Sequence, residues 1–320
     1  MPSNPCGPGV QKGIPLLQTS LLDEFVGYLA PEDFITELTE ELGDRVSDIY
    51  GRLVLAKRPP TPPAWVANIW CTPMRMSISS ISDAAKKLRS IQRNWALYSF
   101  AFHRRAALIS EMLPKVAARP IVFGARVPTA PLGSWTLIAV DAILASPHCS
   151  SPFPNGEVHF VEDRTAPPSR AYLKLWELFT ILDERPKPGE LCIDLGASPG
   201  GWTWVLQQLG ARVLSVDKAP LDNRVAKLPG IEYRCGSAFA LDPRAVGPVD
   251  WLFSDVICYP AKLFTLVQKW LAAGNVRRFV CTVKFQGATD FETVRRFAAI
   301  PGSRLLHLHH NKRELTWLRL

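Results

Sequence analysis

The second half of the sequence alternates short apolar runs with amphipathic segments, which predicts alternating strands and helices. Strands are expected at residues 190–195, 212–216, 231–234, 251–255 and 278–284. Helices are expected at residues 169–182, 202–209 and 261–272, and a β-hairpin around residues 311–312. This alternation is typical of an α/β fold with a doubly wound, mostly parallel, Rossmann-like sheet, to which a terminal hairpin adds an antiparallel strand.

The first half has a different pattern, which predicts a smaller α+β module. A strand is expected near residues 25–29, a helix at 32–42 and a second strand at 48–56. A long amphipathic helix is expected from about residue 82 to residue 113, followed by one or two strands within residues 134–150.

Proline-rich stretches suggest where the chain divides. Residues 151–168 contain four prolines, and the helix–strand rhythm begins after them. The first residues are rich in Pro, Gly and polar side chains and contain no apolar signal core. We therefore expect a disordered tail at residues 1–19, an α+β module at residues 20–160 and a Rossmann-like domain at residues 161–320.

Composition narrows the class of protein. The 320 residues are 47% apolar and 21% charged, and no apolar run approaches the ~18–20 residues needed to span a bilayer. The seven cysteines are scattered without a CxxC pair. This argues against a disulfide framework or a zinc site, and it favours a cytoplasmic protein with no membrane partner and no metal.

The net charge of +8 is concentrated in one segment. Residues 75–126 contain ten Lys or Arg and two acidic residues, interleaved with Trp95, Tyr98 and Phe100. Clustered cations among aromatic side chains favour RNA or DNA as a partner, because neutralising phosphates releases counterions. A solvated basic helix face is the open alternative.

The stretch "LCIDLGASPGGWTWVLQQLG", residues 191–210, predicts a strand, a glycine-rich turn and a helix. Gly196, Gly200 and Gly201 would let the backbone approach a ligand closely. The pattern is not G-x-G-x-x-G, and Ser198-Pro199 disfavours a pyrophosphate cradle. The turn therefore favours S-adenosylmethionine over a dinucleotide, although a dehydrogenase or an ordinary strand–turn–helix remains open.

Four charged residues fall where the strands of such a sheet would bring them together. Asp255 and Lys284 end the fourth and fifth expected strands, and Glu314 begins the last one. Lys174 lies on the helix that enters the domain. Because the carboxyl ends of parallel strands line the binding crevice, these side chains are candidates for one site.

Six motifs in this half resemble the FtsJ-like ribose 2′-O-methyltransferases. They are "PPSRAYLKL", "DLGASPGGWT", "SVDKAP", "SDVICYPAKL", "TVKF" and "RELTWLRL". The resemblance is greatest to the RlmM-type enzymes, which methylate a cytidine ribose of large-subunit rRNA. It covers nearly all of residues 165–320. In the first half it is weaker: "FVGYLAPEDFITELTEEL" is similar to the start of the family's ferredoxin-like module and "TLIAVDAILASPHCSSPF" to the end of its THUMP region.

The resemblance implies a catalytic tetrad at Lys174, Asp255, Lys284 and Glu314. Lys284 would be the base for a ribose hydroxyl, and Lys174 the neighbouring cation that favours its neutral form. The two carboxylates would orient the lysines, and no metal is needed. The cofactor would be S-adenosylmethionine, and the residues expected to contact it are Gly196, Ser198, Pro199, Gly200, Gly201, Trp202, Asp217, Ser237 and Asp255.

Two departures from the family pattern concern the cofactor. Ala171 stands where the family has Ser, and Ser237 where it has an Asp beside the adenine amino group. A neutral hydroxyl accepts a hydrogen bond more weakly than a carboxylate, so we expect weaker cofactor binding.

Other functions remain open at this level. The chain lacks the segment of an exocyclic-amine methyltransferase, and Cys258 and Cys281 lack the context of a nucleophile. Methylation of a tRNA or an mRNA cap, or a non-catalytic RNA-binding role, stays possible beside the leading expectation of an rRNA enzyme that acts as a monomer. His307, His309 and His310 are expected to lie at the surface or face RNA.

Overall fold

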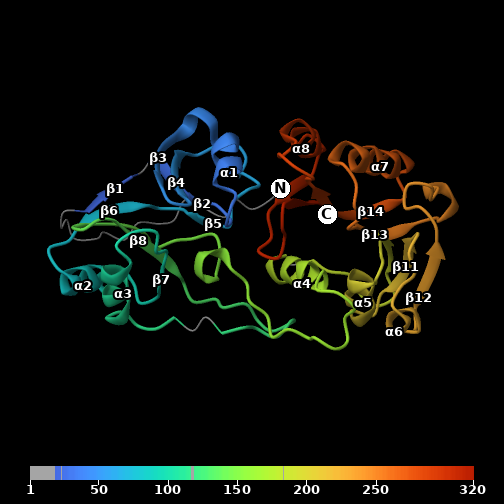
Figure 1. Cartoon of the computed structure of the whole chain (residues 1–320), viewed down its shortest axis with the longest axis horizontal. Helices are drawn as coiled ribbons and strands as arrows, with labels where there is room; N and C mark the ends of the chain where they lie inside the picture. Colours follow the sequence, from blue (N-terminus) through green and yellow to red (C-terminus); the bar gives the residue numbers. More distant parts are fainter. Residues whose placement is uncertain (1–18, 23, 117–118, 183) are drawn as a thin grey trace. The chain divides into compact units, whose positions relative to one another are not determined.

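The computed structural model describes residues 19–22, 24–116, 119–182 and 184–320. The chain divides into two compact units, Met1–His159 and Phe160–Leu320, which we describe separately (Figure 1). Nearly all of the expected disordered tail, residues 1–19, lies outside the described residues.

The second unit is built on a seven-stranded sheet. The strands are β10 (Leu191–Leu195), β11 (Arg212–Asp217), β12 (Ile231–Cys235), β13 (Val249–Ser254), β14 (Val276–Lys284), β15 (Ser303–Leu306) and β16 (Glu314–Arg319). Their order is β12-β11-β10-β13-β14-β16-β15. The first five are parallel, and β16 pairs antiparallel with both β14 and β15. This is the expected mixed α/β, Rossmann-like fold, because β11 and β12 are added on one side of the central strand β10, and β13 and β14 on the other.

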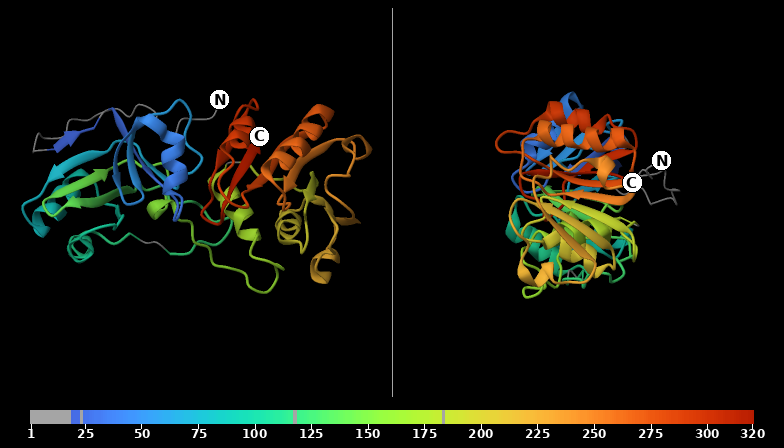
Figure 2. Two further views of the ribbon diagram at one scale, coloured as in Figure 1. Left: turned by 45° about the horizontal axis from the view of Figure 1, so that its top comes forward. Right: turned by 90° about the vertical axis from the view of Figure 1, so that its right-hand side faces the viewer.

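Helices cover both faces of this sheet (Figures 1 and 2). They are α4 (Tyr172–Ile181), α5 (Gly201–Gln208), α6 (Asn223–Ala226), α7 (Pro260–Ala273) and α8 (Phe291–Ala298). Helices α4 and α5 lie on one face, and α7 and α8 pack together on the other. The core is strongly aromatic: Trp251 stacks on Phe253, and Phe297 packs against the fully buried Trp317.

The first unit contains two smaller sheets. A five-stranded sheet has the order β1 (Thr19–Leu21), β6 (Met74–Ser77), β9 (Ala142–Ser146), β8 (Gly133–Ala139) and β7 (Trp95–Leu97). A four-stranded antiparallel sheet has the order β3 (Val46–Tyr50), β4 (Leu53–Lys57), β2 (Phe25–Leu29) and β5 (Asn68–Trp70). The helices of the first unit are α1 (Ile35–Leu42), α2 (Ile81–Ile91) and α3 (His103–Glu111).

The single helix expected over residues 82–113 is wrong. Helix α2 ends at Ile91, strand β7 follows, and α3 begins only at His103. The buried Trp95 indole donates to the carbonyl of Leu88 at 2.9 Å, and β7 pairs parallel with β8. Tertiary pairing of this short apolar segment thus overrides a helical periodicity that continues on both sides of it.

The single strand expected at residues 48–56 is also wrong. The segment forms a hairpin of β3 and β4 around Gly51, whose φ of +61° lies in the left-handed region where glycine is favoured.

Five cysteines of the described part are free thiols, whereas Cys71 is in a disulfide, which the scattered spacing of the cysteines did not predict. Among the described residues, no helix is long and apolar enough to cross a membrane.

Candidate active site

The glycine-rich turn connects β10 to α5 with a backbone that needs glycine at defined points. Gly196 has a φ of +81°, and a Cβ atom there would lie 2.7 Å from the Cα of Val256. A Cβ atom on Gly201 would lie 2.5 Å from Ser169 Oγ. Gly200, at a φ of +112°, is also in a region that other residues rarely adopt. The turn is therefore held tightly between the segments that precede α4 and follow β13.

Asp217, at the end of β11, fixes the other side of this turn. Its Oδ2 accepts from the backbone N–H of Ser198 at 3.0 Å, and its Oδ1 accepts from that of Ala219 at 3.0 Å. Ser198 Oγ donates to the carbonyl of Pro220 at 2.8 Å. A carboxylate has about four lone-pair positions, so both oxygens of Asp217 can still accept from a ligand's hydroxyl groups.

Two buried polar atoms close to this turn have no hydrogen-bond partner among the described residues. One is Oδ1 of Asp194 on β10, and the other is Ser169 Oγ. The second oxygen of Asp194 accepts from Thr203 Oγ1 at 2.7 Å. Burial raises the pKa of Asp194 to about 7. Buried polar groups are normally paired, so each of these two atoms can still take a hydrogen-bond partner.

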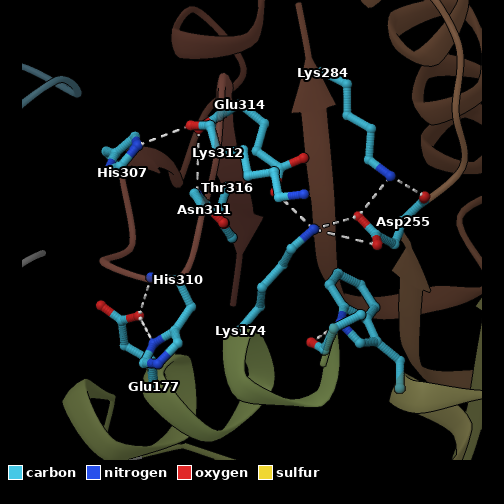
Figure 3. Close-up of polar contacts among 12 residues, drawn as sticks. Lys174, Glu177, Asp255, Lys284, His307, His310, Asn311, Lys312, Glu314 and Thr316 are labelled. Carbon is cyan, nitrogen blue, oxygen red and sulfur yellow. Dashed lines mark hydrogen bonds and ion pairs between the residues drawn. The ribbon is translucent and has the colours of Figure 1, made fainter. Parts of the chain in front are cut away.

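Four ionisable side chains from four different elements meet in one cluster (Figure 3). Lys174 Nζ lies 3.1 Å from Asp255 Oδ1 and 2.6 Å from Glu314 Oε1. Lys284 Nζ lies 3.0 Å from the same Asp255 Oδ1 and donates to the Asp255 carbonyl at 2.5 Å. All four side chains are at most 18% exposed. The sequence-predicted tetrad is thus one connected group with Asp255 at its centre.

The fold explains why these residues meet. Asp255 directly follows β13, Lys284 ends the neighbouring β14, and Glu314 begins β16, where it is the cross-strand partner of Lys284. Lys174 approaches from helix α4. Burial lowers the pKa of the Lys174 ammonium, but the charges of Asp255 and Glu314 outweigh burial, so this pKa is raised above its ordinary value. Lys174 is therefore a permanent cation in the cluster.

The remaining predicted cofactor residues are less uniform in placement. The Trp202 indole is buried and donates to the carbonyl of Ala171 at 3.0 Å, so its side chain fixes the start of α4. Ser237 lies partly exposed in the loop after β12, where its Oγ accepts from the Phe239 N–H at 3.3 Å. Pro199 follows Ser198 within the turn itself.

The expectation for the three histidines is wrong at two of them. His307 is buried, and its Nε2 lies 3.1 Å from the carbonyl oxygen of Lys312. The partly buried His310 lies with its Nδ1 2.8 Å from Glu177 Oε2. Only His309 is exposed. The two rings pack inward because the loop folds over α4, a contact that local sequence does not reveal.

Two buried acidic residues, Asp194 and Glu177, are not among the residues predicted from the sequence. Each had a signal in the sequence, since each interrupts an otherwise apolar run: "LCIDL" for Asp194 and "LWELF" for Glu177. A carboxylate in a buried run requires hydrogen-bond donors from elsewhere, and is therefore worth singling out.

The second half of the chain is similar to a known protein family. Residues 167–286 match the FtsJ-like methyltransferase family. This region is similar to the FtsJ-like methyltransferases. The match includes the glycine-rich turn and three members of the tetrad, while Glu314 lies beyond it.

Curated relatives match about half of this chain. "Ribosomal RNA large subunit methyltransferase M" of Halorhodospira halophila is 37% identical over 172 residues, 51% of this chain and 50% of the relative. The proteins of that name from Aromatoleum aromaticum and Methylococcus capsulatus are 34% and 33% identical, over 46% and 53% of this chain and 44% and 52% of the relatives. The chain therefore spans about half the length of the curated relatives it matches.

The resemblance to the FtsJ-like and RlmM-type enzymes is thereby confirmed for the second half of the chain. Among solved structures, TrmN from Thermus thermophilus covers 93% of this chain and 99% of its own, at 13% identity and a TM-score of 0.37.

Proposed function

We propose that this chain is an S-adenosylmethionine-dependent ribose 2′-O-methyltransferase whose substrate is a cytidine of large-subunit rRNA. The observation that carries the proposal is the Lys174–Asp255–Lys284–Glu314 cluster, a set of two lysines and two carboxylates joined at 2.6–3.1 Å. A binding module would gain nothing from two ammonium groups fixed on one carboxylate oxygen. The names of the matching relatives support rRNA as the substrate.

The residues of the glycine-rich turn fit S-adenosylmethionine. Asp217 would accept from the ribose hydroxyls of the cofactor, since both of its oxygens have acceptor positions left. The unpaired Asp194 Oδ1 and Ser169 Oγ would take part on the amino-acid side, where the cofactor carries an ammonium and a carboxylate group. Ser237 would lie beside the adenine. When bound, the cofactor supplies a methyl group on a positively charged sulfur.

The tetrad would handle the proton of the ribose hydroxyl. Lys284, in its neutral form, accepts that proton at Nζ as the oxygen becomes a nucleophile. Lys174 stays cationic because of Asp255 and Glu314, and its charge would stabilise the developing oxyanion. Asp255 Oδ1 lies 3.0–3.1 Å from the Nζ atoms of both lysines, so the base is positioned before the substrate arrives.

The first unit would bind the RNA as the α+β, THUMP-like module expected from the sequence. The basic segment maps to α2, α3 and the residues around them, where several of its cations are exposed. Those on or beside the two helices are Lys86, Arg89, Arg93 and Arg104. Phe102, directly before α3, is 45% exposed and could stack on an unpaired base.

A methylation assay tests the proposal directly. The protein is incubated with total RNA and methyl-labelled S-adenosylmethionine, and 2′-O-methylated positions are mapped. We expect label on the ribose of a cytidine in large-subunit rRNA. Label on a base would contradict the proposed chemistry, and label on tRNA or mRNA would contradict the proposed substrate. Absence of cofactor binding at millimolar concentration would instead indicate a non-catalytic RNA-binding protein.

A further inference from the structure

Glu177 is a buried carboxylate that the proposed chemistry does not use. Its side chain is 4% exposed, on the apolar helix α4. Its Oε1 accepts from the backbone N–H of His309 at 2.6 Å, and its Oε2 accepts from the N–H of His310 at 2.9 Å and from the ring Nδ1 of His310 at 2.8 Å. Three donors therefore converge on one carboxylate, which offsets the cost of burying it.

These donors all belong to the connection between β15 and β16, residues 307–313. The connection is braced from within as well: Asn311 Nδ2 donates to Thr316 Oγ1 at 3.1 Å and to the carbonyl of Glu314 at 3.3 Å. It ends at Glu314. Whatever fixes this connection therefore fixes the point from which the Glu314 side chain leaves the backbone.

Glu177 and Lys174 lie three residues apart and hence on the same face of α4 (Figure 3). Helix α4 thus contacts residues 309–314 at two points. Lys174 holds the Glu314 side chain at 2.6 Å, and Glu177 holds the backbone five and four residues before it. The Lys174 contact brings the Glu314 carboxylate into the cluster, and the Glu177 contacts fix the backbone that leads to Glu314.

We propose that Glu177 is a positioning residue for methyl transfer: by holding the His309–His310 backbone against α4, it places Glu314 for its contact with Lys174. This inference rests on the proposed function, since it assigns Glu177 a role in the same site. It predicts that Glu177 affects the rate of the chemical step and not the binding of cofactor or RNA.

Glu177→Gln is the variant that tests this, because it keeps the shape and removes the charge. One side-chain oxygen becomes an NH₂ group that faces N–H donors, so the connection loses part of its anchor. We expect kcat to fall about 10- to 100-fold, the range for a misplacement of about 1 Å. The KM for RNA and the Kd for S-adenosylmethionine should stay within about twofold. His310→Ala, which keeps both backbone contacts, should give a smaller loss.

The first unit offers a matched control in Glu41. This half-buried carboxylate also accepts from two successive backbone N–H groups, those of Ala64 at 3.1 Å and Trp65 at 2.9 Å. Glu41→Gln makes the same chemical change in the other unit. We expect it to leave kcat at saturating RNA unchanged.

A double-mutant cycle with Glu314→Gln separates positioning from general weakening of the fold. If Glu177 acts through Glu314, the double variant should be about as slow as Glu314→Gln alone. Losses that multiply, or an unchanged kcat in Glu177→Gln, would overturn the inference. Hydrogen exchange gives a readout without activity: the His309 and His310 amides should exchange faster in Glu177→Gln than in wild type. A wild-type protein without methyl transfer would refute the proposed function, while unchanged exchange in Glu177→Gln would refute the anchor itself.

Discussion

Lys284 and Glu314 lie directly opposite one another in the antiparallel pair β14 and β16, and Asp255 directly follows β13, the strand on the other side of β14. The strand order of the sheet thus places a lysine and two carboxylates side by side, and α4 adds Lys174 as the second lysine. The site depends on the antiparallel insertion of β16 between β14 and β15, because a parallel strand there would start at the opposite edge.

Lys284→Ala tests the assignment of the base. The substitution removes the amine proposed to accept the ribose proton, so we expect methyl transfer to fall below about one-hundredth of wild type, within the range usual for general-base catalysis. Binding of S-adenosylmethionine, measured by calorimetry, should be nearly unchanged. The exposed Lys227→Ala is a control for lost surface charge and should retain full activity. A Lys284→Ala protein with the wild-type rate would rule out this role.

Gly196→Ala tests whether the glycine-rich turn is required for folding as well as for binding. The added methyl would meet the Val256 backbone at 2.7 Å with a φ of +81°. The left-handed backbone and the overlap together should cost about 3 kcal/mol of the free energy of unfolding.

Gly287→Ala is the matched control for this turn. A Cβ atom at Gly287 has no neighbour within 4 Å, and its φ lies outside the left-handed range. Urea denaturation should show a change below about 0.5 kcal/mol there. Equal midpoints for the two variants would mean that the turn tolerates a side chain at Gly196.

The strands of the second unit were predictable to within about two residues because each is a short apolar run ended by glycine, proline or a charged residue. Strand ends in such a sheet share one edge, so Asp255 and Lys284 could be placed together without a structure. The contact of both lysines with the same oxygen of Asp255 could not be predicted. That one oxygen of Asp255 contacts both lysines follows from side-chain geometry, which the order of residues does not encode.

The first unit was less predictable for a physical reason. Around Trp95 the apolar spacing suits a helix, yet β7 forms because β8 is available as a partner. The anchor of Glu177 on residues 309 and 310 joins positions more than 130 residues apart, so only the fold reveals it. Local pattern predicts elements, and long-range pairing decides the exceptions.

Ser237→Asp tests the proposed adenine side of the cofactor site. A carboxylate accepts a hydrogen bond more strongly than a hydroxyl does, by about 1 kcal/mol. We expect the Kd for S-adenosylmethionine to fall about fivefold in calorimetry. Ser237→Asn is the neutral counterpart of similar size and should bind like wild type. Unchanged or weaker binding by the Asp variant would show that Ser237 does not face the adenine amino group.

The buried His307 should make the free energy of unfolding depend on pH. Burial lowers its pKa from 6.5 to about 4, so the folded protein keeps this imidazole neutral while the unfolded chain takes up a proton below about pH 6.5. The unfolded state then binds more protons, and stability falls as the pH drops from about 6.5 to about 4. The loss of stability should reach about 3 kcal/mol at most.

The variant His307→Gln tests this expectation, because it keeps a donor for the Lys312 carbonyl but cannot titrate. In urea unfolding at pH 7 and pH 4.5, the second unit of this variant should lose less stability on acidification than wild type. The exposed His148→Gln should behave like wild type. Equal losses in all three proteins would mean that protonation of His307 does not contribute to the acid sensitivity of the fold.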